Sequence, residues 1–438
     1  MKAKKIMLIG AALGLASVTA QAQSTDQLQQ ALAQAQAAAA QAQAAAKQAQ
    51  AALEQALAAA YEARKSSASV AAPAAEKSGG GGLTVSSGAN SATLYGLIDV
   101  TLSSVSQKNA AGDSKVGFQT PWFSGSRWGV TGSHDLAAGG LKAIFRLESE
   151  FVPATGEEDT PGVLFNRDAW AGFQSEDLGK LTFGRQNALG RDISAGYMDP
   201  YGSAKASTNE GGGTNTNNFK QIIYYGGSAT GTRINNGVVW KKAFSNGLVA
   251  GAAYAFGDTV GDAAEGTTTS VALAYNGGAF NVASFATQAK LNGLNSNAYS
   301  VGGNFTAGTV RVNAGYFRYT GEQGALGSRT DNAYTVSLNF APGGKMDYQL
   351  GYQVMKADNA ALSKPVGGIV KNAFASIAGV TAVGSGNRNT VYASTMYHFD
   401  KSTEVYLAAD YLTLDGSYGT VNGSNNQTEV GVGLRTRF

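Results

Sequence analysis

All charged side chains in the segment spanning residues 141–151 fall on one parity. That parity comprises Lys142, Arg146, Glu148 and Glu150. The other parity is apolar and comprises Leu141, Ala143, Phe145, Leu147 and Phe151. A strand directs alternate residues to opposite faces, so the segment predicts one apolar and one charged face. In a soluble sandwich a second sheet would cover the apolar face. In a membrane barrel that face would meet lipid, and the charged face would line a lumen.

The chain has few residues that could support catalysis, redox chemistry or metal binding. The chain has no Cys, which excludes disulfide bonds and cysteine-based metal or redox sites. It has two His, His134 and His398, and both lie beside short turns rather than in long loops where a catalytic site could be assembled. The run Gly79 to Gly82 follows no strand and opens no helix, so it is not a phosphate-binding loop. We therefore predict no enzyme activity, no cofactor and no metal site.

The N-terminus predicts secretion. Three lysines within the first five residues precede an apolar run, and residues 20–22 form an Ala-Gln-Ala cleavage site, so residues 1–22 are expected to be a signal peptide. Its removal takes three of the 33 basic residues and leaves 30, equal to the 30 acidic ones. This balance gives no indication of nucleic-acid binding. No later run approaches the ~20 apolar residues of a spanning helix, so any membrane crossing is expected to use strands.

Residues 23–65 are almost entirely Ala and Gln, which predicts a long helix. Ser24 and Gln27 fit a capping box at its start. A heptad frame with d at Leu28 and a at Leu32 is apolar at every a and d position. Two interpretations stay open, a self-associating coiled coil and a single solvated helix.

A folded part is expected over residues 93–438, after a flexible linker at 66–92 that is rich in Ser, Ala and Gly. Beyond the linker, apolar and polar residues alternate in segments separated by turn residues. We count sixteen strands, at approximately 93–103, 123–135, 140–152, 165–176, 179–187, 232–244, 247–257, 268–276, 279–288, 297–306, 308–320, 331–341, 344–356, 387–399, 402–413 and 427–438. Tight turns alternate with long polar loops, of which the longest spans about 188–231. This pattern predicts an all-β fold, a sixteen-stranded antiparallel transmembrane β-barrel.

Several segments carry a more specific pattern. They are ATLYGLIDV at 92–100, GSRWGVTGSHDLAAGGLKAIFRLE at 125–148, FNRDAWAGF at 165–173, DLGKLTFGRQ at 177–186, RINNGVVW at 233–240 and VGLRTRF at 432–438. Together they resemble the trimeric general porins of Gram-negative outer membranes over about residues 92–438. The resemblance implies a homotrimer in the outer membrane, a third external loop folded into the lumen, and passive diffusion of ions and small hydrophilic solutes. The family's usual third-loop motif is replaced here by MDPYG at 198–202, and the helical extension is absent from the ordinary family.

The selectivity of a diffusion pore depends on charges at its narrowest section. The predicted constriction residues are Arg127, Arg146, Arg167, Arg233, Glu148, Glu150, Asp192 and Asp199. Most follow from inward parity or from the long loop, whereas Arg167 is included because the resemblance implies a lumen arginine on the fourth strand. Arg185 shares the parity of outward-facing residues and is ranked lower. A basic wall facing an acidic loop predicts a modest anion preference. The alternative is a solvated inner surface or salt bridges that merely hold the loop.

A structural role is the second function class. A helix over residues 23–65 would span roughly 60 Å. Both ends of an even-stranded barrel emerge at the rim with the short turns, which is periplasmic, so the helix is expected in the periplasm, where it could tether the barrel to the cell wall. A barrel hydrolase is less favoured because the histidines lie at that same rim. Expected partners are outer-membrane lipid, further copies of the chain, permeating solutes and the cell wall, but not nucleic acid.

Overall fold

A computed structural model describes most of the second of two units in this chain. The units are Met1–Ala74 and Ala75–Phe438. The described residues are 82–119, 122–136, 140–198, 233–362, 380–418 and 423–438. The predicted signal peptide and the Ala/Gln-rich helix therefore lie outside the described residues. Within the described part of the chain, no helix is long and apolar enough to cross a membrane.

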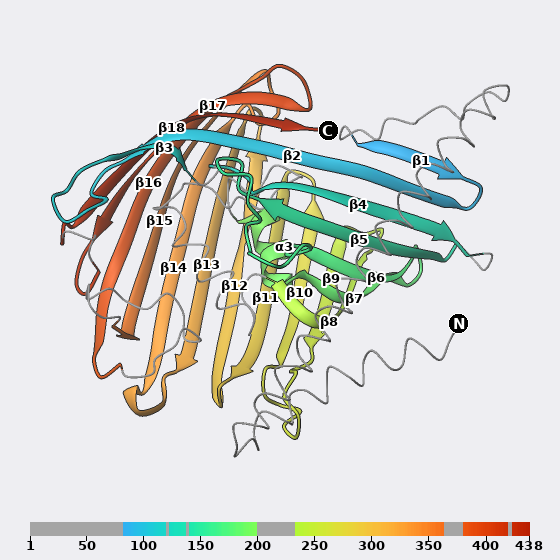
Figure 1. The fold of residues 1–438 in the computed structure, drawn as a ribbon, viewed down its shortest axis with the longest axis horizontal. Coiled ribbons are helices and arrows are strands. Elements are labelled where there is room, and N and C mark those ends of the chain that lie inside the picture. The colour runs from blue at the N-terminus through green and yellow to red at the C-terminus, as the bar shows by residue number, and fades with distance from the viewer. Residues whose placement is uncertain (1–81, 120–121, 137–139, 199–232, 363–379, 419–422) are drawn as a thin grey trace, which may run out of the picture. The chain divides into compact units, whose positions relative to one another are not determined.

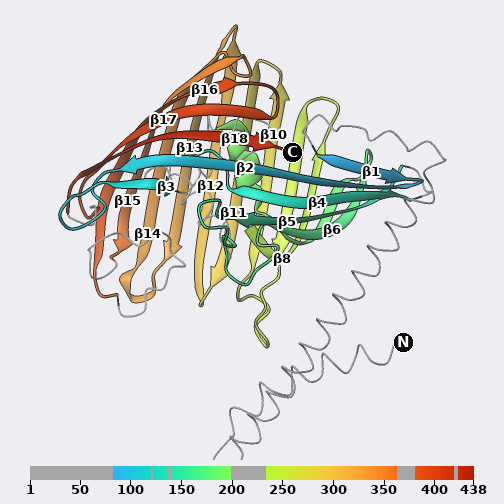
Figure 2. The same cartoon turned by 45° about the horizontal axis from the view of Figure 1, so that its top comes forward.

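Sixteen strands close into one antiparallel barrel (Figure 1 and Figure 2). They are β2 (Asn90–Val105), β4 (Ser126–Asp135), β5 (Lys142–Phe151), β6 (Asp168–Ser175), β7 (Gly179–Asn187), β8 (Arg233–Ala243), β9 (Leu248–Ala255), β10 (Thr268–Gly277), β11 (Phe280–Leu291), β12 (Leu294–Ala307), β13 (Val310–Glu322), β14 (Ser328–Phe340), β15 (Met346–Ala361), β16 (Val383–His398), β17 (Thr403–Leu414) and β18 (Asn426–Arg437). Each pairs with the next, and β18 pairs with β2 to close the ring. The predicted fold class and strand number are confirmed.

Alternation along the strands matches the predicted two faces. In β14 the outward Tyr334, Val336 and Phe340 are exposed, whereas the inward Thr335 and Ser337 are buried. In this strand, apolar side chains thus face the outside of the barrel and polar side chains face the inside. This is the arrangement that a lipid-facing wall around a hydrated lumen requires.

The folded part begins earlier than the sequence predicted. Short strand β1 (Leu83–Ser87) and the first residues of β2 fall inside the range 66–92, which we expected to be linker. β1 pairs with β2 through a turn in which Gly88 has φ of 56°. The five-residue alternation of β1 is too short to be distinguished from the Ser- and Gly-rich sequence before it, because its stability depends on pairing with β2.

One connection is also shorter than predicted. We expected a long loop at 289–296, but β11 and β12 are joined by the two-residue turn Asn292-Gly293, with φ of 56° and 72°. Asn-Gly favours this left-handed hairpin turn. The polar residues around it belong to the extended strands rather than to a loop. The other two short elements are β3 (Lys115–Gln119), paired with β2, and the 3₁₀ turn η3 (Gly324–Leu326).

Candidate pore constriction

The loop after β7 enters the barrel as helix α3 (Leu189–Tyr197). The helix packs against the inner faces of β9, β10, β11 and β12. Leu189 and Met198 at its two ends are fully buried in the apolar cluster on this wall. Tyr197 adds polar contacts, since its hydroxyl donates to Asn276 Oδ1 at 2.8 Å and its carbonyl accepts from Asn304 Nδ2 at 3.0 Å. Residues 188–198 therefore lie against the inner wall, and the rest of the predicted loop, residues 199–231, lies outside the described residues.

Glycines make room for this helix. A Cβ at Gly315 would lie 2.9 Å from Met198 Cβ, and a Cβ at Gly302 would lie 2.8 Å from Met198 Cγ. At the other end, a Cβ at Gly251 would lie 3.1 Å from Leu189 Cδ2. The distances at Gly302 and Gly315 leave no space for a side chain, and at Gly251 the Leu189 side chain would have to shift by a few tenths of an ångström. The helix α3 thus packs against strand positions occupied by glycine, which has no side chain.

Asp192 fastens α3 to the wall by charge. Its carboxylate forms an ion pair with Lys241 of β8 and accepts a hydrogen bond from Asn187 Nδ2 at 2.9 Å. Burial raises the pKa of this carboxyl, but the Lys241 ammonium and the hydrogen bonds from Lys241 and Asn187 outweigh burial and hold the pKa below its usual range. Asp192 is therefore ionised at neutral pH, and its negative charge is compensated by Lys241.

Arg167 holds two carboxylates at once. It lies immediately before β6 and is buried. Its Nε donates to Glu148 Oε1 at 2.5 Å, and its Nη1 donates to Glu150 Oε2. The second oxygen of Glu148 accepts from the Tyr95 hydroxyl at 2.7 Å. Because guanidinium presents several donors in a fixed plane, one arginine fixes both acidic side chains on the inner face of β5.

Arg146 lies beside this group and is about half exposed. Its Nη1 is 3.5 Å from Asp168 Oδ2. Its guanidinium carbon is 5.6 Å from the centre of the Tyr95 ring and 6.0 Å from that of Trp170. Lys180 Nζ lies 3.9 Å from the centre of the Trp170 ring. The aromatic faces thus hold two cations at the wall by cation–π attraction.

The other predicted site residues divide into three cases. Arg127 is buried on β4 and pairs in register with Glu150, so the two side chains share the inner face. Arg233 is buried at the start of β8, but a bulge around Asn236 interrupts the alternation from which its direction was predicted. Asp199 lies outside the described residues. Arg185, ranked lower, donates to the Asn166 carbonyl at 2.8 Å and to Asn235.

The model of the Gram-negative porin family matches residues 11–417. The chain belongs to this family. An outer membrane porin of Bordetella pertussis is 30% identical over 385 residues, covering 80% of this chain and 94% of the relative. Outer membrane porin protein 32 of Delftia acidovorans is 26% identical over 367 residues, with 80% of this chain and 94% of the relative covered.

Solved porin structures share the fold. The anion-selective porin from Comamonas acidovorans has a TM-score of 0.64 at 22% identity, covering 80% of this chain and 100% of that chain. OmpT of Vibrio cholerae, in a trimer form, has a TM-score of 0.56 at 14% identity, with 80% and 100% covered. The family model and the 30% identical relative show that the chain is an outer-membrane channel for passive diffusion rather than an enzyme, as the sequence predicted.

Sequence reasoning missed several charged and aromatic residues of this porin. They are Tyr95, Asp168, Trp170, Lys180 and Lys241, together with Arg191, a fully buried residue of α3. Asp168 and Trp170 are two residues apart on β6 and face the same side of the strand. The alternation along β6 could therefore have identified Asp168 as an inward-facing residue. Lys180 and Lys241 stand near short turns, where lysine is ordinarily a solvated rim residue, and no sequence signal marks the contact with α3.

Proposed function

We propose that the channel prefers anions. The constriction group, as we define it, has six basic members (Arg127, Arg146, Arg167, Lys180, Arg191 and Lys241) and four acidic members (Glu148, Glu150, Asp168 and Asp192). This excess of basic residues carries the proposal. Ion pairs with Arg167, Arg146 and Lys241 cancel as much basic as acidic charge, so the group as a whole keeps the net positive charge of its members, and a passing anion meets a net positive wall. The anion selectivity named for the Comamonas relative supports the same proposal.

The wild-type reversal potential tests this proposal. The full-length protein in a planar bilayer under a salt gradient should give a reversal potential of the sign expected for anion preference. Its magnitude should shrink as salt rises, because the screening length falls from ~10 Å at 0.1 M to ~3 Å at 1 M. A cation-selective sign at low salt would contradict the proposal.

We propose that the porin acts as a homotrimer whose barrels carry the contacts between subunits. The trimer form recorded for OmpT and the continuous apolar outer face support this. Deleting residues 24–65 should leave a trimer on unheated gels that dissociates on heating, because apolar strand faces supply most of the buried area. Monomers after this deletion would instead make the Ala/Gln-rich segment the main trimerisation element. The matched control is the full-length protein treated identically.

We also propose that residues 23–65 extend into the periplasm and tether the barrel toward the cell wall. The short turns mark the periplasmic rim, and both ends of an even-stranded barrel emerge on one side. Protection of this segment from protease in intact cells, and its cleavage after the outer membrane is permeabilised, tests the location. The tether and the channel are compatible roles in one protein.

A further inference from the structure

A second stretch of chain lies inside the barrel, on the wall formed by β16, β17, β18 and β2. We call residues 122–125 the inner segment. Trp122 and Phe123 are fully buried and pack with Tyr392, Met396, Tyr406 and Ala408. The outward neighbours of these strand residues, such as Leu407, are exposed, so the inner segment lies on the lumen side. The alternation predicts a strand from residue 123, whereas β4 begins at Ser126.

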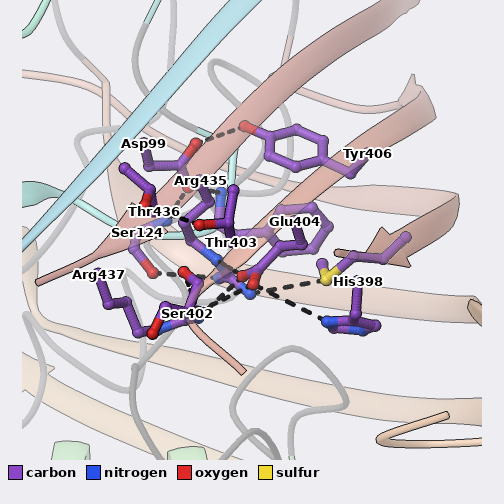
Figure 3. Close-up of polar contacts among 12 residues, drawn as sticks. Asp99, Ser124, His398, Ser402, Thr403, Glu404, Tyr406, Arg435, Thr436 and Arg437 are labelled. Carbon is purple, nitrogen blue, oxygen red and sulfur yellow. Dashed lines mark hydrogen bonds and ion pairs between the residues drawn. The ribbon is translucent and has the colours of Figure 1, made fainter. Parts of the chain in front are cut away.

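Asp99 holds the middle of the inner segment, and Thr101 Oγ1 accepts the backbone N–H of Trp122 at 2.9 Å. Asp99 Oδ2 accepts the backbone N–H of Phe123 at 3.2 Å and that of Ser124 at 2.9 Å, and its Oδ1 accepts the Tyr406 hydroxyl at 2.5 Å. Figure 3 shows Asp99 and Tyr406 pointing toward each other across the wall, with Arg435 beside them. Asp99 is completely buried. A buried carboxylate with three donors fixes the backbone that supplies them.

Arg435 reinforces this attachment. Its guanidinium carbon lies 5.2 Å from the centre of the Phe123 ring, and its Nη1 donates to Ser124 Oγ at 3.3 Å. The same arginine forms an ion pair with Glu404 of β17 (Figure 3). The inner segment is therefore attached to β2, β17 and β18 at once.

The other end of the inner segment touches the constriction. A Cβ at Gly125 would lie 1.9 Å from Glu150 Oε1, so the Glu150 carboxylate rests directly against the Gly125 backbone. Glu150 is one of the two carboxylates bound by Arg167. Two residues after Gly125, Arg127 stands opposite Glu150 in the strand register. A displacement of the inner segment would therefore remove the backbone contact that limits where the Glu150 carboxylate can lie.

We infer that Asp99 is a positioning residue for ion selection: by fixing the inner segment, it holds Glu150 against Arg167 at the constriction. Asp99 lies on β2 and has no contact with Glu150 or Arg167 of its own among the hydrogen bonds and ion pairs described above. Its effect on permeating ions is transmitted through the backbone of residues 123–125. This inference rests on the proposed anion-selective constriction and adds the element that keeps it in place.

The test uses Ser124→Cys in the full-length chain, which otherwise has no Cys. Ser124 is completely buried, so a water-soluble thiol reagent should label the new cysteine slowly. Adding Asp99→Ala leaves the two backbone N–H groups without their acceptor, and the labelling rate should rise roughly tenfold or more. In the chain without the cysteine, Asp99→Ala should shift the reversal potential toward cations, because a loosened Glu150 adds its charge to the lumen.

Ser103→Ala is the matched control. Ser103 is on the same strand and face, is buried, and donates to Glu429 at 3.1 Å without touching the inner segment. It should change neither readout. If Asp99→Ala does not fold, Tyr406→Phe removes only the donated hydroxyl and should move both readouts the same way by a smaller factor.

The outcomes distinguish the proposed anion preference from the positioning role of Asp99. A wild type without anion preference would overturn the proposed function. Unchanged labelling and an unchanged reversal potential in the Asp99→Ala and Tyr406→Phe variants of an anion-selective wild type would overturn only the positioning role. Equal changes in Ser103→Ala would also overturn it, by showing a general loss of barrel stability.

Discussion

Replacing Arg167 by Gln is expected to turn the channel toward cations and to destabilise the barrel. The substitution removes one positive charge and leaves Glu148 and Glu150 without their shared partner. Breaking a buried ion pair by removing one member costs about 3–5 kcal/mol, because the remaining charge stays buried. In the lumen, a change of about 1.4 kcal/mol in the interaction with a passing ion alters relative permeability about tenfold. Reversal potential and the temperature of heat-induced gel shift measure the two effects.

The double variant Arg167→Gln with Glu148→Gln is the control for this prediction. It restores the local net charge of the wild type while still lacking the guanidinium. Its reversal potential should return most of the way to the wild-type value, whereas its stability should return only in part because the ion pair between Arg167 and Glu150 is still missing. An Arg167→Gln channel with wild-type selectivity would place the selecting charges elsewhere in the constriction group.

Replacing Gly315 by Leu is expected to lower the single-channel conductance. The wall at this position has no room for a side chain beneath Met198, so Leu must push the end of α3 into the lumen. Adding methylenes to a packed site costs about 1–3 kcal/mol, and the cheapest relief here is movement of α3 rather than of the sheet. Conductance at a fixed voltage and salt concentration measures the narrowing.

Combining Gly315→Leu with Met198→Ala should restore conductance. The Leu side chain then fills the volume that Met198 vacates, so the total volume at the contact is nearly conserved. Met198→Ala alone should leave a cavity costing about 2–5 kcal/mol and a noisier open channel. If Gly315→Leu conducts like the wild type, α3 does not form the narrow section. If the double variant is worse than either single one, the two residues do not share a site.

The sequence predicted those features that depend on period and parity. Alternation alone placed Arg146, Glu148 and Glu150 on one inner face, because a side-chain period of two leaves only two choices for each strand. It failed where one residue breaks the period, as at the bulge before Gly237 that separates Arg233 from the inner parity. No periodic signal marks such a bulge in advance.

Contacts between residues far apart in the sequence were the second feature that could not be predicted from the sequence. Lys241 is 49 residues from Asp192, and Asp99 is more than 300 residues from Tyr406. Contacts between residues so far apart depend on how the strands are ordered around the ring and on their relative tilt. The role of the glycines that contact α3 could not be predicted either. In the sequence, Gly302 and Gly315 are only unfavourable strand residues, and their function becomes clear once the position of the helix is known.

Strand β1 limits how far β18 can extend along the edge of β2 with which both strands pair. Phe438 pairs with Gly96 through two backbone hydrogen bonds of 2.9 and 3.0 Å, and Leu83 of β1 already occupies the same edge of β2 opposite Leu94. A slip of one residue would turn Arg435 to the lipid and Leu434 to the lumen. A slip of two toward β1 would bring Phe438 onto the position of Leu83. Because β1 and β18 follow each other along the same edge of β2, β1 excludes register shifts of β18 by two or more residues in that direction.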